Sequence, residues 1–251
     1  DANENPYPPY PGDENSRSLN SYAPPQPAEL IDGFSKLFQI SPSNLFLSRG
    51  ADEAIDLLVR AFCMPYRDGI LITEPSFVMY ETAADIQGAF VKSVPLDSDY
   101  QLQVDQIVTA IENTPNIKLV FICSPNNPTG NLMRRADILR IAQETFGKAL
   151  VVVDQLYSDY SGEPSLINEI ASHPNLVILR SMSKEYSLAG ERIGITAAHE
   201  EVVQILTRLM PPYPLTVTSI RAALRMLSAQ GLEYGRTNIK RLVEERQRVQ
   251  A

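Results

Sequence analysis

Three short apolar runs, each followed at once by polar residues, constrain the fold of this chain more than any other feature. The runs are rich in Val, Ile and Leu, and they span residues 118–123, 149–153 and 176–179. Uninterrupted apolar runs of this length are typical of strands that are buried on both faces of a parallel sheet. Because ligands bind beyond the carboxyl ends of parallel strands, we expect the polar residues after these runs to meet in one crevice.

Strand and helix patterns alternate along most of the chain. Further strands are predicted at 45–47, 69–72, 89–95 and 193–197. Helices are predicted at 27–38, 51–62, 77–86, 104–111, 134–146, 202–206 and 218–227, and from 234 onward. Such alternation implies right-handed crossovers and a mostly parallel sheet. We therefore predict a three-layer α/β fold, in which helices cover both faces of the sheet.

The composition argues for a globular protein that acts on small molecules. The chain has 251 residues, of which 44% are apolar and 21% charged, and its net charge is −8. This acidic charge argues against a nucleic acid or an anionic membrane as the principal partner. No apolar run approaches the roughly 20 residues that span a bilayer. Residues 1–26 are rich in Pro and lack the apolar core of a secretory signal, so we expect a cytoplasmic location.

The few Cys and His residues do not suggest a metal site. Cys63, on a predicted helix, and Cys123, on a predicted buried strand, are expected to be reduced thiols. His173 and His199 are isolated and have no metal-ligand spacing. A mechanism built on Lys is therefore favoured over one built on His or a metal.

An amide, a carboxylate and an amine follow the three apolar runs. Asn127 lies in the segment SPNNPTG (124–130), Asp154 directly follows the second run, and Lys184 ends the segment SMSK after the third. A Lys can hold an aldehyde cofactor as a Schiff base, and a buried carboxylate can pair with a protonated pyridine nitrogen. An amide or a phenol can hydrogen-bond to the phenolic oxygen of the same ring, and Ser and Arg can hold its phosphate. These are the parts of a pyridoxal phosphate (PLP) site.

Each of these residues also has an ordinary structural interpretation. Asn127 lies among turn dipeptides, an Asp after a strand commonly caps a turn, and Tyr157 fits a core position equally well. A lone Lys after a strand is usually a solvated charge, but here Ser181, Ser183 and Arg192 accompany it. Two hydroxyls and a guanidinium beside an amine favour a phosphate-sized anion site.

The sequence resembles the fold-type I, PLP-dependent aminotransferases, and within their class II subfamily it is most similar to the histidinol-phosphate aminotransferases. The matching segments are DANENP (1–6), SRGADE (48–53), SPNNPTG (124–130), Ser183-Lys184, and LAG (188–190) with Arg192. The resemblance covers nearly the whole chain. One departure is Asp154-Gln-Leu-Tyr157, where the family usually has Asp-Glu-Ala-Tyr.

The resemblance implies roles for the matching residues. Lys184 would hold PLP as a Schiff base. Burial and conjugation would lower the pKa of its amine, so that the amine could move a proton. Asp154 would keep the pyridine nitrogen protonated, while Asn127 and Tyr157 would contact the cofactor's phenolate oxygen. Gly50 and Ala51, just before a helix, would point N–H groups at the phosphate. Asp52 is better explained as an acidic residue that stabilises the first turn of the helix than as a direct ligand. The implied cofactor-binding residues are Gly50, Ala51, Asp52, Phe77, Asn127, Asp154, Tyr157, Ser181, Ser183, Lys184 and Arg192, with Tyr22 from the partner subunit of a homodimer.

The implied reaction is transamination between L-histidinol phosphate and 2-oxoglutarate, which yields imidazole-acetol phosphate and L-glutamate in histidine biosynthesis. Two alternatives stay open, namely a PLP-dependent decarboxylase of the threonine-phosphate type and a truncated chain that binds PLP without turnover. Residues 1–26 are expected to form an arm, 27–230 the PLP-binding domain, and 231–251 the start of a helix that leads to a largely absent small domain. Because no Arg clamp for the substrate can be assigned, we expect residues 1–251 to transaminate poorly.

Overall fold

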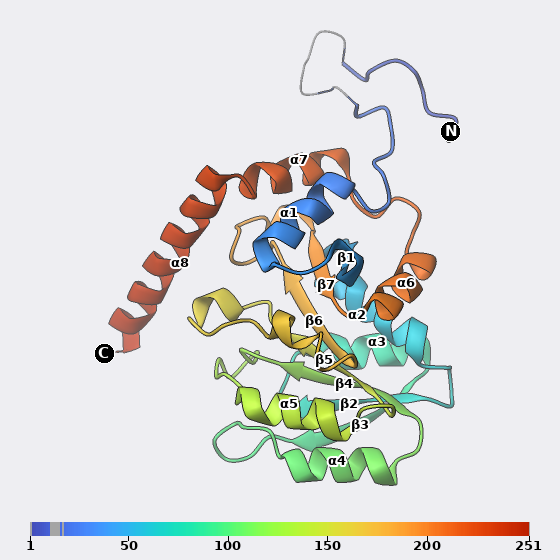
Figure 1. Cartoon of the computed structure of the whole chain (residues 1–251), viewed down its shortest axis with the longest axis vertical. Helices are drawn as coiled ribbons and strands as arrows, with labels where there is room; N and C mark the ends of the chain where they lie inside the picture. The colour runs from blue at the N-terminus through green and yellow to red at the C-terminus, as the bar shows by residue number, and fades with distance from the viewer. Residues whose placement is uncertain (1, 11–15, 17, 251) are drawn as a thin grey trace.

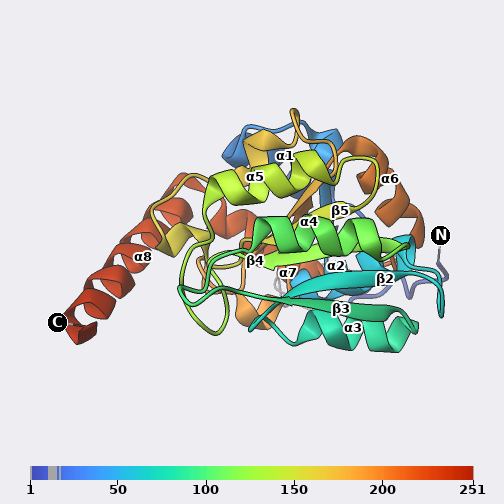
Figure 2. The same ribbon diagram turned by 90° about the horizontal axis from the view of Figure 1, so that it is seen from below.

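A computed structural model describes residues 2–10, 16 and 18–250, with the backbone alone at position 250. Asp1 of the DANENP segment, residues 11–15 and 17 of the arm, and Ala251 lie outside the described residues. A seven-stranded sheet lies between two layers of helices, which confirms the predicted three-layer α/β fold (Figure 1). The last helix projects away from this body in both overall views (Figures 1 and 2).

The sheet is mostly parallel, as the alternating pattern predicts. Its spatial order is β1-β7-β6-β5-β4-β2-β3, and β7 runs antiparallel to both of its neighbours. The strands are β1 (Leu45–Ser48), β2 (Gly69–Glu74), β3 (Phe90–Pro95), β4 (Ile117–Cys123), β5 (Leu150–Asp154), β6 (Leu176–Ser181) and β7 (Gly194–Ala197). The three apolar runs at 118–123, 149–153 and 176–179 therefore form the adjacent central strands β4, β5 and β6.

The helices divide between the two faces of the sheet (Figure 2). They are α1 (Ala28–Phe38), α2 (Gly50–Phe62), α3 (Met79–Gln87), α4 (Val104–Asn113), α5 (Arg135–Glu144), α6 (Glu200–Leu209), α7 (Val217–Met226) and α8 (Ala229–Gln250). Short 3-10 helices are η2 (Pro42–Asn44), η3 (Ser158–Tyr160), η4 (Leu166–Glu169) and η5 (Ala189–Glu191). One apolar core packs α2, α3 and α6 on the sheet, and the other packs α1, α4 and α5.

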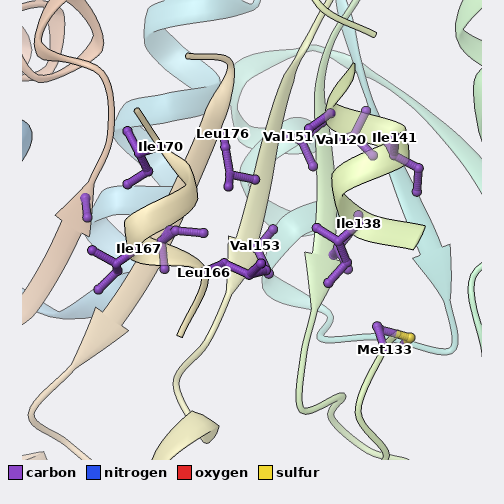
Figure 3. Packing of buried hydrophobic residues seen from close by; sticks show 14 of the residues in the cluster. Val120, Met133, Ile138, Ile141, Val151, Val153, Leu166, Ile167, Ile170 and Leu176 are labelled. Atoms are coloured by element: carbon purple, nitrogen blue, oxygen red, sulfur yellow. The ribbon is translucent and has the colours of Figure 1, made fainter. Parts of the chain in front are cut away.

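The central strands contribute to both cores because successive side chains of a strand point to opposite faces. In β4, Val120 and Ile122 belong to the core under α4 and α5, whereas Leu119 and Phe121 belong to the core under α2 and α3. Figure 3 shows the first of these cores, where side chains of β4, β5 and β6 meet those of α5 and η4. Both faces of the central strands are thus buried, and only their ends remain for polar chemistry.

All the predicted strands and helices are present, but three details of the prediction are wrong. Gly50 and Ala51 are the first residues of α2 and do not precede it. Cys63 follows α2 in an extended conformation, and it is buried because its thiol lies against the start of β2, 3.6 Å from the Gly69 carbonyl oxygen. Phe77 precedes α3, which begins at Met79.

The pairing register brings several strand ends to one edge of the sheet. Cys123 of β4 pairs with Asp154 of β5, and Ser181 of β6 pairs with Gly194, the first residue of β7. Gly194 also pairs with Ser48, the last residue of β1, so the amino end of α2 begins at this same edge. We call it the carboxyl edge. None of the described helices combines the length and apolarity that crossing a membrane requires.

Candidate active site

Asp154 lies at the centre of the carboxyl edge and is almost completely buried. Its Oδ2 accepts a hydrogen bond from the Tyr80 hydroxyl at 2.8 Å, and its Oδ1 accepts one from the Leu156 N–H at 3.1 Å. Tyr80, in α3, is itself fully buried, and its ring stacks on that of Phe121 with 4.7 Å between centroids. The carboxylate is therefore held in one orientation by a phenol that the apolar core fixes in place.

Burial controls the charge of this carboxyl group. It raises the pKa of Asp154 to about 6, although the hydrogen bonds from Tyr80 and the Leu156 N–H act to lower it. Burial and the nearby Asp154 also raise the pKa of the Cys123 thiol to about 12. A cation brought next to Asp154 would stabilise the ionised form and replace part of the lost hydration. The site is thus suited to a positively charged ring nitrogen.

We predict that Tyr80→Phe raises the pKa of Asp154 further. The substitution removes the donated hydrogen bond, which stabilises the ionised carboxylate, and it leaves the stacked ring in place. A hydrogen bond to a charged group contributes about 1.5–3 kcal/mol, so the shift should be at least about one pH unit. Carboxyl carbon NMR of the cofactor-free protein measures it. Tyr160→Phe is the control, and an unchanged Asp154 titration in Tyr80→Phe would contradict the assigned hydrogen bond.

The amino end of α2 forms a close contact with Arg192. Gly50 has a φ of +79°, which favours Gly, and a Cβ there would lie 2.5 Å from Nη2 of Arg192, so that the guanidinium would have to move. Arg192 Nη2 lies 2.9 Å from Oδ2 of Asp52, which stands in the first turn of α2. The first N–H groups of an α-helix have no partner within the helix and favour an anion. Gly50, Ala51 and Arg192 therefore form a cationic cradle, in which Asp52 now balances the guanidinium.

Ser181 and Ser183 are adjacent to this cradle through the sheet. Ser181 Oγ donates to Ser183 Oγ at 2.9 Å and accepts from the Ser183 N–H at 3.0 Å. Ser181 is buried and pairs with Gly194, which in turn pairs with Ser48 beside α2. The structure thus brings together all the predicted phosphate contacts of this chain. Hydroxyls, a guanidinium and helix N–H groups form a donor set that matches a phosphate dianion.

Lys184 lies three residues beyond the end of β6, in the connection to η5. Its Nζ lies 5.9 Å from the centroid of the Tyr157 ring, which is half-buried just before η3. Burial, together with Cys123 and Asp154, raises the pKa of Tyr157. Lys184 is exposed in this chain, so its withdrawal from water stays a prediction for the cofactor-bound protein.

Asn127 is half-buried and lines a cleft of about 710 Å³ together with Tyr157. The opposite wall of this cleft is α8, through Leu242, Val243 and Arg246. The preceding Asn126 is buried and structural, since its Nδ2 donates to the Pro75 carbonyl oxygen at 2.9 Å. Asn126 thereby fixes the SPNNPTG turn to the segment after β2 and leaves the Asn127 amide free to face the cleft. Lys184 and Asp154 do not line this cleft.

The two remaining predicted residues have aromatic neighbours in this chain. Phe77 is half-buried and packs edge-on against Tyr80, with 5.7 Å between ring centroids. Tyr22 of the arm stacks on Tyr213, with 4.1 Å between centroids, and is 58% exposed. The next part of the arm is held more firmly, because the Gln26 amide exchanges two hydrogen bonds with Leu47 of the edge strand β1.

Sequence reasoning missed Tyr80. The residue has the spacing of a core position in α3, and it is 74 positions away from the carboxylate that it contacts. No local pattern links the two. The signal available in the sequence was a Tyr among the buried positions of a helix, since a buried hydroxyl requires a partner.

Comparison with known proteins shows to which family this chain belongs. The family model described as aminotransferase class I and II matches residues 3–251. A histidinol-phosphate aminotransferase of Aliivibrio fischeri strain MJ11 is 44% identical over 218 residues, which are 87% of this chain and 62% of the relative. The chain therefore spans less than two thirds of the length of this curated relative.

Solved structures agree on the fold. A histidinol-phosphate aminotransferase from Sinorhizobium meliloti, in complex with pyridoxal 5′-phosphate, matches with a TM-score of 0.86 and 22% identity over 99% of this chain and 68% of that one. An L-threonine-O-3-phosphate decarboxylase from Porphyromonas gingivalis matches with a TM-score of 0.71 and 26% identity over 85% of this chain and 62% of that one. These two solved proteins, an aminotransferase and a decarboxylase by name, share one fold.

Proposed function

Because the chain belongs to the class I and II aminotransferase family, we propose that it transfers an amino group from L-histidinol phosphate to 2-oxoglutarate. The products are imidazole-acetol phosphate and L-glutamate, and the step belongs to histidine biosynthesis. One observation carries the reaction type: an amine, a buried carboxylate and an anion cradle lie along one edge of the sheet. The substrate is supported by the name of the 44% identical relative.

The cofactor of this proposal is PLP, and the residues present fit it. A Cβ at Gly50 would displace the Arg192 guanidinium, and the cradle offers guanidinium, hydroxyl and helix N–H donors. We propose that Gly50, Ala51, Ser181, Ser183 and Arg192 hold the phosphate. Asp52 would then act on the phosphate indirectly, through its ion pair with Arg192.

The ring-contacting residues of the proposal are Asp154, Asn127, Tyr157 and Phe77. Bound PLP supplies an aldehyde that takes up the amino group and a ring that accepts the electron pair released at the substrate carbon. The Asp154 carboxylate would hold a proton on the ring nitrogen, which makes the ring a better electron acceptor. Asn127 and Tyr157 would donate hydrogen bonds to the phenolate oxygen, and Phe77 would stack on the ring.

Lys184 would have two tasks in the proposed reaction. Its Nζ would first hold the cofactor covalently. Its amine would also move a proton between the substrate carbon that bears the amino group and the C4′ position of the cofactor. The neighbouring Tyr157 ring, 5.9 Å from Nζ, limits the directions in which this amine can lie.

The organisation of the protein is also part of the proposal. We propose an arm at 1–26, a cofactor-binding domain at 27–230 and a separate helical segment at 231–251. The projection of α8 from the body supports the last of these (Figure 1). We further propose a cytoplasmic homodimer in which the exposed Tyr22 reaches the phosphate site of the partner subunit. The exposed faces of Tyr22 and of its stacking partner Tyr213 are compatible with such a contact.

A spectroscopic assay separates the candidate activities. The PLP-loaded protein is mixed with L-histidinol phosphate, and conversion of the cofactor to its amino form is followed by absorbance. Glutamate is then measured after 2-oxoglutarate is added. Formation of both the amino cofactor and glutamate is the expected result. Release of carbon dioxide from threonine phosphate would instead support a decarboxylase, and stable PLP binding without either reaction would support a binding protein.

A further inference from the structure

A buried ionic cluster lies behind the segment that carries Lys184, outside every role assigned above. Arg180, near the end of β6, is only 3% exposed, and its Nη2 lies 2.7 Å from Oδ1 of Asp159 and 3.6 Å from Oε1 of Glu185. The Glu185 side chain is completely buried. The guanidinium of Arg180 also lies over the Phe38 ring of α1, 5.5 Å from its centroid. We call Arg180, Asp159 and Glu185 the acid–arginine cluster.

The cluster joins the two segments that carry Lys184 and Tyr157. Glu185 directly follows Lys184, and Asp159 lies in η3, two residues after Tyr157. The N–H of Asp159 points to Oε1 of Glu185 at 3.4 Å, in addition to the contacts through Arg180. Breaking these contacts would let the segment after β6 move relative to η3. The distance between Lys184 Nζ and the Tyr157 ring depends on that arrangement.

The cluster holds two acids for one base. Among the described residues, Oε2 of Glu185 and Nε of Arg180 are buried without a hydrogen-bond partner. Burial raises the pKa of Glu185 to about 8, although Arg180 acts to lower it. The other groups that face this carboxyl are Asp159 and Tyr160 from η3 and Tyr186 from its own segment. Gly235 of α8 lies close to the carbonyl oxygen of Glu185. Arg236, the next residue of α8, lines a cleft together with Arg180. Arg180 and Asp159 thus form the closer ion pair, and burial favours the neutral form of Glu185.

We propose that Glu185 is a positioning residue for Lys184. Its carboxyl, held by Arg180 and the Asp159 N–H, fixes the segment after β6 against η3 and so keeps the Lys184 amine beside the Tyr157 ring. What this amine does rests on the proposed function, but its placement does not. Ionisation of Glu185 adds a second buried negative charge beside a guanidinium that Asp159 already balances, which weakens the packing of the segment.

The test measures the Lys184 amine directly in the cofactor-free protein. Lysines are acetylated for short times, and the modification of each is quantified by peptide mass spectrometry, with Lys148 and Lys240 as internal standards. In Glu185→Ala, acetylation of Lys184 is expected to become severalfold faster while the standards stay unchanged. In Glu185→Gln, which keeps the shape and the acceptor oxygen, the rate at pH 7 should equal that of the wild type. Glu163→Ala and Glu163→Gln, at an exposed Glu after η3, serve as controls.

Two further measurements follow the acetylation of Lys184 against pH and the retention of bound PLP. Between pH 7 and 9 the wild-type rate at Lys184, relative to Lys148, should rise as Glu185 ionises, and Glu185→Gln should lack this rise. With PLP, Glu185→Ala should lose the cofactor severalfold faster on dilution.

Acetylation of Lys184 at the wild-type rate in Glu185→Ala would overturn the proposal. If Glu185→Ala does not fold, an unchanged pH rise in Glu185→Gln would overturn it. Failure of the wild type to bind PLP, with altered acetylation in Glu185→Ala, would reject the proposed function and support the positioning role.

Discussion

Replacing Lys184 with alanine is expected to abolish covalent retention of PLP and to lower the rate of amino transfer by roughly 10⁴-fold, because in the proposed reaction the amine would serve both as the attachment point and as the proton carrier. Borohydride reduction of the wild-type protein with PLP, followed by peptide mapping, should place the cofactor on Lys184. The same treatment of Lys184→Ala should leave no adduct. Binding through the phosphate cradle should persist, since Gly50, Ser181 and Arg192 are untouched.

Two further variants show whether this loss is specific. Lys184→Arg keeps the positive charge but does not supply a nucleophilic amine at neutral pH, so it should lose the adduct as completely as the alanine variant. Lys148→Ala removes an exposed Lys that pairs with Glu112, and it should behave as the wild type. An adduct on any Lys other than Lys184, or PLP binding without any adduct, would reject the assignment.

Asp154→Asn is expected to lower the amino-transfer rate by roughly 10²–10³-fold and to leave PLP content nearly unchanged, as is typical when a preorganised charge is removed from a site. The reason is the division of the site into two parts. The proposed phosphate contacts come from α2, the end of β6 with Ser183 after it, and Arg192, whereas Asp154 would act on the ring nitrogen alone. Bound PLP and single-turnover rate are measured on the same samples. Equal losses in both would count against the role of Asp154.

The same substitution should make the cofactor-free protein more stable at alkaline pH. Because burial raises the pKa of Asp154 from 3.8 to about 6, the folded state binds its proton more tightly than the unfolded state does. The resulting stability is complete below pH 3.8 and is lost as the pH rises through about 6. Above that range the ionised carboxylate costs the folded state about 3 kcal/mol, which Asn avoids.

Urea unfolding at pH 8 and pH 5 tests this second effect. The gain in the free energy of unfolding should approach about 3 kcal/mol at pH 8 and fall to roughly half of that at pH 5. Ser158→Ala, at a buried neutral residue in the same connection, is a control that should show no such pH dependence. A gain that is equal at both pH values would mean that the charge of Asp154 is not its cause. A site residue that weakens the fold it belongs to is expected where function requires a buried charge.

Periodicity in the sequence was sufficient to predict the α/β fold and most of the element bounds. The apolar runs before Asn127, Asp154 and Lys184 are strands because Val and Ile fit positions buried on both faces. Their parallel pairing then brings the ends of the three runs to one edge, but of the three residues only Asn127 lines the cleft beside α8. The proposed phosphate residues Ser181, Ser183 and Arg192 could be grouped from local order in the chain, since they lie within twelve positions of one another.

Only the tertiary structure decided which side chains act on these residues. Tyr80 reaches Asp154 across 74 positions, and Arg192 reaches Asp52 across 140. Arg180, Asp159 and Glu185 come together from the end of β6, from η3 and from the segment after Lys184. Strands and helices follow from local periodicity, whereas these contacts depend on how distant elements pack and on how much water the packing removes. The same packing left Lys184 exposed while it buried Asp154 and Glu185, because exclusion of water is a property of the assembled fold rather than of any segment in it.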